Sequence, residues 1–284
     1  MIEQSPAIES VYVEYDVSDQ RTHEAYELLT QSLARVGIEQ TVQLADAAAM
    51  IVIGGDGTLI KAIHKHDFPQ VPIRGINTGT IGFFMSSDPT SQEIDDLAYN
   101  ISGGTYSIDK LSVLDVANSQ GLQLGRAINE AAIRSSSGQA LHMNLQIGSA
   151  DFGKLTGDGV IVSTPSGSTG YAKSAGGPFM HEALRAYEVV PLNPYYSPID
   201  RPAIVPGDLP TQVTVVDIDK RPFQLSLDGK VLRDTGLDEV QVASEETYQF
   251  TISPDTTVDM IRFDGHEYFK KLGQKIREIR EHHS

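Results

Sequence analysis

The chain has 284 residues, of which 40% are hydrophobic and 21% are charged, so it is long enough for two compact domains with separate cores. Its formal net charge of -16 excludes a general affinity for nucleic acid or for an anionic membrane, because both require a basic surface. It contains no cysteine, which excludes disulfides and thiolate metal sites, and it lacks a leader pattern or a long apolar run, so we expect a cytoplasmic protein.

The first hundred residues alternate short apolar runs with segments of helical periodicity. We expect strands at 11–15, 49–53 and 71–76, and helices from Asp19 to Gly37, over Leu59–His64 and from Thr90 to Ile101. This alternation predicts a Rossmann-like α/β domain with a parallel sheet over residues 1–102. Ligands bind such sheets at the carboxyl ends of the strands, where residues 55–58 and 77–82 would lie.

The most informative short segment, residues 53–58, reads I-G-G-D-G-T and follows an apolar run. Glycines let the backbone approach a bulky ligand closely, and Asp56 is the only ionisable side chain of the segment. A strand that turns directly into a helix also directs free amides at a ligand above the sheet. The segment therefore predicts a phosphate cradle formed by Gly54, Gly55 and Gly57 around one acid, with an ordinary glycine-rich turn as the alternative.

From about residue 103 the pattern changes to alternation of apolar and polar residues. Strands are expected at 111–117, 122–128, 141–147, 213–218 and 223–227, which predicts a mostly β domain over residues 103–265. The stretch Pro191–Pro206 is too rich in proline for regular structure and suits a rigid loop or a subunit contact. Residues 266–284 show a helical apolar stripe, and we expect this helix to return to the first domain, with an oligomer contact as the alternative.

A second dense segment, Thr156–Pro178, combines glycines and small hydroxyl residues with one carboxylate, Asp158, and one tyrosine, Tyr171. Small residues permit close approach of a ligand, hydroxyls bond to its polar edges, and a tyrosine ring can cover a flat ring. A low-complexity loop is the alternative, but the strand expected at Val160–Val162 favours folded structure. For Tyr171, packing in a core remains open beside the ligand-binding interpretation.

These segments together resemble bacterial NAD kinases. The resemblance rests on G-G-D-G-T at 54–58, N-T-G-T-I-G-F-F at 77–84, N-E at 129–130, and the block from 157 to 178, in the order and spacing of the family. The first motif also occurs in diacylglycerol-kinase-like and phosphofructokinase-like enzymes and identifies only a superfamily. The block from 157 to 178 is much more specific.

The resemblance implies transfer of the γ-phosphoryl group of ATP to the 2′-hydroxyl of the adenosine ribose of NAD. Asp56 corresponds to the essential acid near that hydroxyl, either as a base or as an orienting group, and Asn129 and Glu130 correspond to the pair that grips the adenosine. Phe83 corresponds to the aromatic residue beside the adenine, and Asp228 to an acidic position near the active-site turn. The further positions implied for NAD binding are Gly57, Thr58, Asp158, Ser166, Thr169, Gly170, Tyr171 and Ser174.

The sequence offers no dedicated metal cage, so we expect Mg²⁺ to be held mainly by ATP phosphates and water, with Asp56 in its outer shell. Lys61 and Arg74 are candidates for steering ATP phosphates, with ordinary surface charges as the alternative. His64 and His66 lie two apart on an expected helix, do not face each other, and are interpreted as solvated surface residues. The resemblance further implies a homodimer or homotetramer.

Two other functions remain open on the sequence alone. A lipid or sugar kinase of the same superfamily would explain residues 54–58 but not the block from 157 to 178. A non-catalytic sensor of NAD or NADP would explain a dinucleotide pocket but has no need of Asp56.

Overall fold

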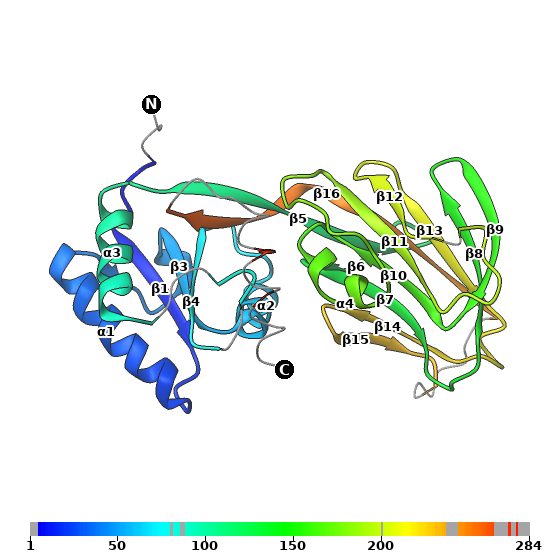
Figure 1. Cartoon of the computed structure of the whole chain (residues 1–284), viewed down its shortest axis with the longest axis horizontal. Helices are drawn as coiled ribbons and strands as arrows, with labels where there is room; N and C mark the ends of the chain where they lie inside the picture. The colour runs from blue at the N-terminus through cyan, green and yellow to red at the C-terminus, as the bar shows by residue number, and fades with distance from the viewer. Residues whose placement is uncertain are drawn as a thin grey trace. The chain divides into compact units, whose positions relative to one another are not determined.

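The computed structural model in Figure 1 describes residues 5–79, 82–85, 89–199, 201–236, 244–263, 272, 273 and 277. The chain divides into two compact units, here called unit 1 (residues 1–110 and 258–284) and unit 2 (residues 111–257). These boundaries fall inside β5 (Ser107–Asn118) and β16 (Glu245–Arg262), two long strands that contribute residues to both units. They differ from the boundaries expected from the sequence, near residues 102 and 265. A pattern of polar and apolar residues does not show where one continuous strand passes from unit to unit.

Unit 1 contains a parallel sheet in the strand order β2-β1-β3-β4, which confirms the predicted α/β architecture. Its elements are β1 (Ser10–Tyr15), α1 (Gln20–Val36), β2 (Glu39–Gln40), η1 (Leu44–Asp46), β3 (Ala49–Gly54), α2 (Asp56–Lys65), β4 (Ile73–Asn77) and α3 (Ser91–Ser102). Helices α1 and α3 lie on one side of the strands, and α2 lies on the other (Figure 1). All of β3 is buried, because helices cover both faces of the sheet.

The helix ends of unit 1 follow from local chemistry. The Asp19 carboxylate accepts hydrogen bonds from the amides of residues 21 and 22 at the start of α1, and Gly37 ends that helix in the left-handed conformation. The Thr90 hydroxyl accepts from the Glu93 amide at the start of α3. Helix α2 begins differently, because Gly55 precedes it and no side chain caps it.

Unit 2 is a β structure of two sheets, as the alternating pattern predicted. One sheet has the order β12-β11-β10-β7-β14-β15. In the other sheet the neighbouring strands follow the order β16-β13-β8-β9, and β5 pairs with β16 and with β6. The further elements are β6 (Gln123–Ala127), β7 (Glu130–Ser135), β8 (Leu141–Ile147), β9 (Ala150–Gly157), β10 (Gly159–Ser163), η2 (Gly167–Thr169), α4 (Tyr171–Ser174), β11 (Ala186–Leu192), β12 (Ala203–Pro206), β13 (Thr211–Val216), β14 (Phe223–Leu227) and β15 (Lys230–Asp234).

Alternate residues of β10 serve two different layers. Val160 and Val162 belong to the large core between the two sheets, whereas Ile161 faces the other way and packs with Ala172 of α4. Helix α4 and the turns around it therefore cover the outer face of the sheet that contains β7, β10 and β11 (Figure 1). This covered face carries Glu130 and lies beneath the segment that contains α4.

The stretch Pro191–Pro206 is not wholly irregular, because it contributes the end of β11 and the whole of β12, and prolines are tolerated there since β12 is an edge strand. The helix expected over residues 266–284 lies outside the described residues apart from positions 272, 273 and 277. No helix in the described part of the chain is both long and apolar enough to cross a membrane.

Candidate active site

In unit 1, Asp56 is the first residue of α2, and its carboxylate is held by a short loop distant in sequence. Oδ2 accepts a hydrogen bond from the backbone N–H of Phe83 at 2.6 Å, and Oδ1 accepts from those of Phe84 at 3.1 Å and Met85 at 3.3 Å. A carboxylate has about four acceptor positions, so the three amides that donate to it from the described residues leave room for one more donor. The acid is thus fixed in orientation and can accept one further hydrogen bond.

The glycines of the turn divide into two groups. A Cβ atom at Gly54 would lie 2.6 Å from Cβ of Thr58, so that glycine is required by internal packing. A Cβ atom at Gly55 or Gly57 would meet nothing within 4 Å. The Thr78 amide donates to the Gly54 carbonyl at 3.0 Å, which places the two loops together at the carboxyl end of the sheet, as expected. Only Gly55 and Gly57 border space that a ligand can use.

The two basic candidates of unit 1 have different environments. Lys61 is exposed on α2. Arg74 is only 4% exposed, donates from Nη1 to the Ile261 carbonyl at 2.9 Å, and lies 4.1 Å from the ring centroid of Phe263. Burial, and secondly the charge of Arg262, lower the pKa of Arg74 to about 9. This placement favours a structural role for Arg74 over the steering of solvent-borne phosphates.

In unit 2, Asp228 holds the backbone that carries the predicted adenosine-binding pair. It forms a two-residue hairpin turn with Gly229, both with positive φ, between β14 and β15. Its Oδ2 accepts from the Ile128 amide at 2.9 Å, and its Oδ1 accepts from the amides of Asn129 at 2.7 Å and Glu130 at 3.1 Å. Asp228 therefore fixes the start of β7 in the same way that the 83–85 amides fix Asp56.

The side-chain oxygens of Asn129 and Glu130 are the polar groups that this pair offers to a ligand. Oδ1 of Asn129 is buried and has no hydrogen-bond partner among the described residues. Burial raises the pKa of Glu130 to about 7, and the negative charge of Asp228 adds to this rise. Buried polar groups usually have partners, so Oδ1 of Asn129 is suited to binding a ligand.

The segment from 164 to 178 lies directly beside this pair. The Thr164 amide donates to the Asn129 carbonyl at 2.8 Å, and a Cβ atom at Gly170 would lie 3.9 Å from Oε2 of Glu130. Ser166 and Thr169 are half-buried, and Gly170, Tyr171 and Ser174 are exposed at the end of η2 and along α4. The structure thus brings this group together with Asn129 and Glu130.

Asp158 lies apart from this group. It precedes β10, whereas Glu130 pairs with Ser163 at the other end of that strand. Five residues of strand, about 15 Å, separate the two positions. The Asp158 carboxylate accepts from Asn193 Nδ2 at 2.8 Å and is exposed, so it lies at the opposite end of β10 from Glu130 and does not contact it.

Glu188 of β11 is a buried carboxyl group that the motifs do not include. It is 0% exposed, neither oxygen has a partner among the described residues, and burial raises its pKa to about 7. In the sheet register Ser163 of β10 lies between Glu188 and Glu130, so the three side chains share the covered face. A Cβ atom at Gly177 would lie 2.6 Å from Oε2 of Glu188, which places this carboxyl under the end of the 164–178 segment. The only signal in the sequence is one glutamate in an apolar strand.

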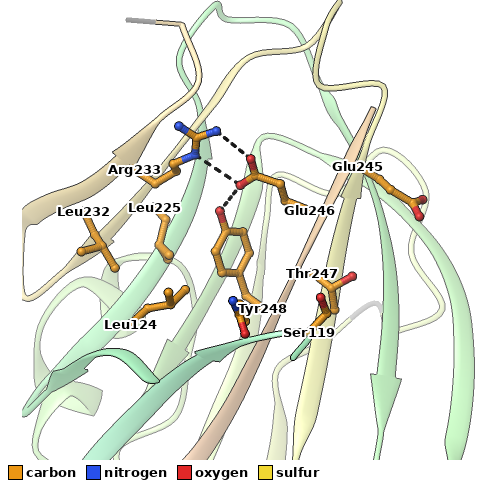
Figure 2. Close-up of a pocket in the computed structure, with 10 residues that line it drawn as sticks. Ser119, Leu124, Leu225, Leu232, Arg233, Glu245, Glu246, Thr247 and Tyr248 are labelled. Carbon is orange, nitrogen blue, oxygen red and sulfur yellow. Dashed lines mark hydrogen bonds and ion pairs between the residues drawn. The ribbon is translucent and has the colours of Figure 1, made fainter. Parts of the chain in front are cut away.

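A separate pocket of about 600 Å³ lies in unit 2 (Figure 2). Its polar wall includes Arg233, whose Nη2 pairs with Glu246 Oε1 at 2.7 Å, and Tyr248, whose hydroxyl also donates to Glu246. Leu124, Leu225 and Leu232 form its apolar wall. None of the predicted site residues lines this pocket, so its volume does not mark the candidate site.

The described residues contain no group of three His, Cys, Asp or Glu side chains that could hold a metal ion. His66 is not the solvated surface residue that its helical spacing suggested. Its Nε2 lies 3.0 Å from Oε2 of Glu14, and its side chain is 17% exposed. Oε1 of the same carboxylate pairs with Nζ of Lys65 at 2.7 Å. Helical spacing could not show this contact, because Glu14 belongs to β1.

Models of one protein family match both halves of the chain. Residues 9–106 match the ATP-NAD kinase N-terminal domain, and residues 128–259 match the ATP-NAD kinase C-terminal domain. The NAD kinase of Methylococcus capsulatus is 33% identical over 82% of this chain and 81% of its own length. The NAD kinase of Alcanivorax borkumensis is 32% identical over 84% of this chain and 79% of its own length.

Two solved structures share the fold. The yeast NADH kinase complexed with NADH has a TM-score of 0.78 at 15% identity and covers 95% of this chain and 87% of its own. An NAD kinase from Archaeoglobus fulgidus in complex with ATP has a TM-score of 0.72 at 23% identity and covers 95% of this chain and 99% of its own. With the matched domains and the relatives above 30% identity, the chain belongs to the NAD kinase family.

Proposed function

We propose that this chain transfers the γ-phosphoryl group of ATP to the 2′-hydroxyl of the adenosine ribose of NAD, giving NADP. The observation that carries this proposal is the oriented carboxylate of Asp56, which three amides of the described residues hold at a turn whose Gly55 and Gly57 border open space. Relatives above 30% identity are named NAD kinases, and none of the comparisons supports a lipid kinase, a sugar kinase or a sensor.

Phosphoryl transfer depends more on alignment of the reacting groups and on charge neutralisation than on covalent catalysis, because it passes through a loose transition state. The amides of Thr58 and Leu59 donate to the Gly55 carbonyl, at 2.9 and 3.2 Å. The amides of Asp56 and Gly57, at the start of α2, are therefore the ones suited to a phosphate. In this proposal Asp56 accepts the hydrogen bond of the attacking hydroxyl and fixes its direction.

We further propose that Mg²⁺ arrives with the ATP phosphates, since Mg²⁺ usually keeps several waters and few protein ligands. When bound, it would neutralise the developing phosphate charge. The remaining acceptor position of Asp56 suits either the hydroxyl or one water of the ion. The cytoplasmic location and the homodimer or homotetramer stay predictions.

The direct test is to incubate the purified protein with Mg-ATP and NAD and to measure NADP with an NADP-specific dehydrogenase. NADP formation that requires both ATP and the divalent metal is the expected result. Parallel reactions with polyphosphate and with NADH determine the donor and acceptor preferences. NAD binding without any NADP formation would instead identify a sensor, and phosphorylation of an added lipid or sugar would identify the other kinase class.

Replacing Glu130 by alanine tests the adenosine-binding pair. We expect a rise in the KM for NAD, or a fall in kcat/KM for NAD, because the half-buried Glu130 lies beside Asn129 and the 164–178 segment. The KM for ATP should change much less. Steady-state kinetics with each substrate varied in turn measures both, and an equal effect on the two substrates would indicate structural damage.

Replacing Tyr171 by alanine tests whether its ring contacts the dinucleotide. Tyr171 is 37% exposed. Removing its ring should therefore lower the free energy of unfolding by much less than the roughly 3 to 5 kcal/mol expected for a buried aromatic residue. NAD binding should weaken by about 1 to 3 kcal/mol, the scale of one stacked ring. Calorimetric titration and thermal melting measure the two quantities. Phe152→Ala is the matched control, because that ring is 38% exposed and lies on β9. A Tyr171 variant that melts far lower but binds NAD normally would remove the residue from the site.

A further inference from the structure

The loop that holds Asp56 is itself held by a buried arginine. Arg262 is the last residue of β16 and is 3% exposed. Its Nη1 donates to the Phe84 carbonyl at 3.2 Å, and its Nε donates to Oδ2 of Asp109 at 3.3 Å. All of these residues belong to unit 1.

The carbonyl that Arg262 contacts and the amide that Asp56 contacts belong to one peptide unit. The Phe84 carbonyl accepts from Arg262, and the Met85 N–H of the same planar peptide donates to Oδ1 of Asp56 at 3.3 Å. A continuous chain of hydrogen bonds thus runs from Asp109 through Arg262 and the Phe84–Met85 peptide to Asp56. A charged donor at the carbonyl polarises the peptide, which strengthens its N–H as a donor to the carboxylate.

We propose that Arg262 is a positioning residue for phosphoryl transfer, which fixes the Phe84–Met85 peptide and through it the Asp56 carboxylate. The inference rests on the proposed function, because it assigns Asp56 to the attacking hydroxyl. A small displacement of such a group reduces the rate strongly, since the reacting atoms must be aligned.

The burial of Arg262 supports this role. Arg74 is buried in the same unit, and its pKa is lowered by burial and by the charge of Arg262. Two buried guanidinium groups that repel each other are costly to stability. A neutral donor would anchor a backbone carbonyl at lower cost, whereas a charged donor also orients and polarises the peptide.

The test measures kcat and KM for Arg262→Gln, Arg262→Lys and Asp109→Asn. For Arg262→Gln we expect kcat to fall about ten- to a hundredfold and the KM for NAD to rise much less, because Asn129 and Glu130 of the predicted adenosine-binding residues lie in unit 2 and are not held by Arg262. Arg262→Lys should recover part of the loss, since it keeps a cationic donor. Asp109→Asn, which is only partly buried, should give a smaller fall in the same direction and serves if the arginine variants do not fold.

A double-mutant cycle separates positioning from general damage. Because Arg262 acts through Asp56, Arg262→Gln should lower kcat much less in an Asp56→Asn background than in the wild type. An equal fractional loss in both backgrounds overturns the proposal. Leu33→Ala, a core change in α1, is the control for destabilisation and should leave kcat per NAD-binding site unchanged.

A measurement without substrate distinguishes failure of this inference from failure of the proposed function. Amide hydrogen exchange at Met85 should be faster in Arg262→Gln than in the wild type and in Leu33→Ala, whatever the substrate is. Unchanged exchange would overturn the hydrogen-bond chain even if the wild type forms NADP. If the wild type forms no NADP but the exchange at Met85 changes as expected, the hydrogen-bond chain from Arg262 to Asp56 is confirmed and the proposed function is wrong.

Discussion

Replacing Asp56 by asparagine is expected to lower kcat for NADP formation by about 10² to 10⁴, the range of acid–base assistance by one side chain. NAD affinity and circular dichroism should stay close to those of the wild type. The physical reason is that Asp56 is the only carboxylate in the segment 53–58, and that its three donors among the described residues leave one acceptor position for the hydroxyl. Retention of more than about a tenth of the wild-type kcat would exclude a direct role.

The contacts of Asp56 show what the asparagine variant changes besides its charge. An asparagine offers one acceptor oxygen and one NH₂ group, so the NH₂ must face at least one of the backbone N–H donors of residues 83–85. We therefore expect a modest loss of stability, about 1 to 3 kcal/mol for one unsatisfied amide. Thermal melting measures this loss, and kcat must be expressed per NAD-binding site. A loss of activity that merely follows the loss of binding sites would assign Asp56 a structural role only.

Asp56 and Asp228 use the same device in the two units. Each carboxylate follows a strand, stands beside a glycine and accepts hydrogen bonds from three consecutive backbone amides. In unit 1 the amides orient the acid, whereas in unit 2 the acid orients the backbone of Asn129 and Glu130. The second arrangement supports a positioning role for Asp228, which does not require it to bind ATP.

The sequence predicts those parts of the fold that depend on local periodicity. Alternating strands and helices indicate the parallel sheet of unit 1, and the turn at 54–58 marks the carboxyl end of β3. The amide partners of Asp56 could not be predicted, because Phe83 to Met85 are distant in sequence and meet it only through folding. The same applies to Asp228 and residues 128–130.

The register of the strands also lies beyond sequence reasoning. Asp158 and Ser166 belong to one motif, yet β10 runs between them and places Asp158 at the end of the strand far from Glu130. Glu188 comes to the site because β11 pairs with β10 in a register that no local pattern determines. Membership in the motif therefore predicts which segment belongs to the candidate site. The register of the strands determines which of its side chains lie close to Glu130.

Glu188 makes the stability of unit 2 depend on pH. Its pKa is raised from 4.5 to about 7 by burial, so the folded state binds the proton more strongly than the unfolded state. The stability that the neutral group contributes is complete below about pH 4.5 and is lost as the pH rises through about 7. Glu130 has a raised pKa in the same range, so both groups contribute to this loss.

Replacing Glu188 by glutamine should remove its share of this pH dependence, because glutamine stays neutral. At pH 8 we expect the variant to be more stable than the wild type by up to about 3 kcal/mol, the free energy that corresponds to the rise in pKa. At pH 4.5 the two proteins should differ little. Urea unfolding of both proteins at a series of pH values measures the difference, and Glu245→Gln, an exposed glutamate on β16, is the control. Parallel stability curves from pH 4.5 to 8 would show that Glu188 is charged without cost in the folded protein, and hence that the 164–178 segment does not keep it from water.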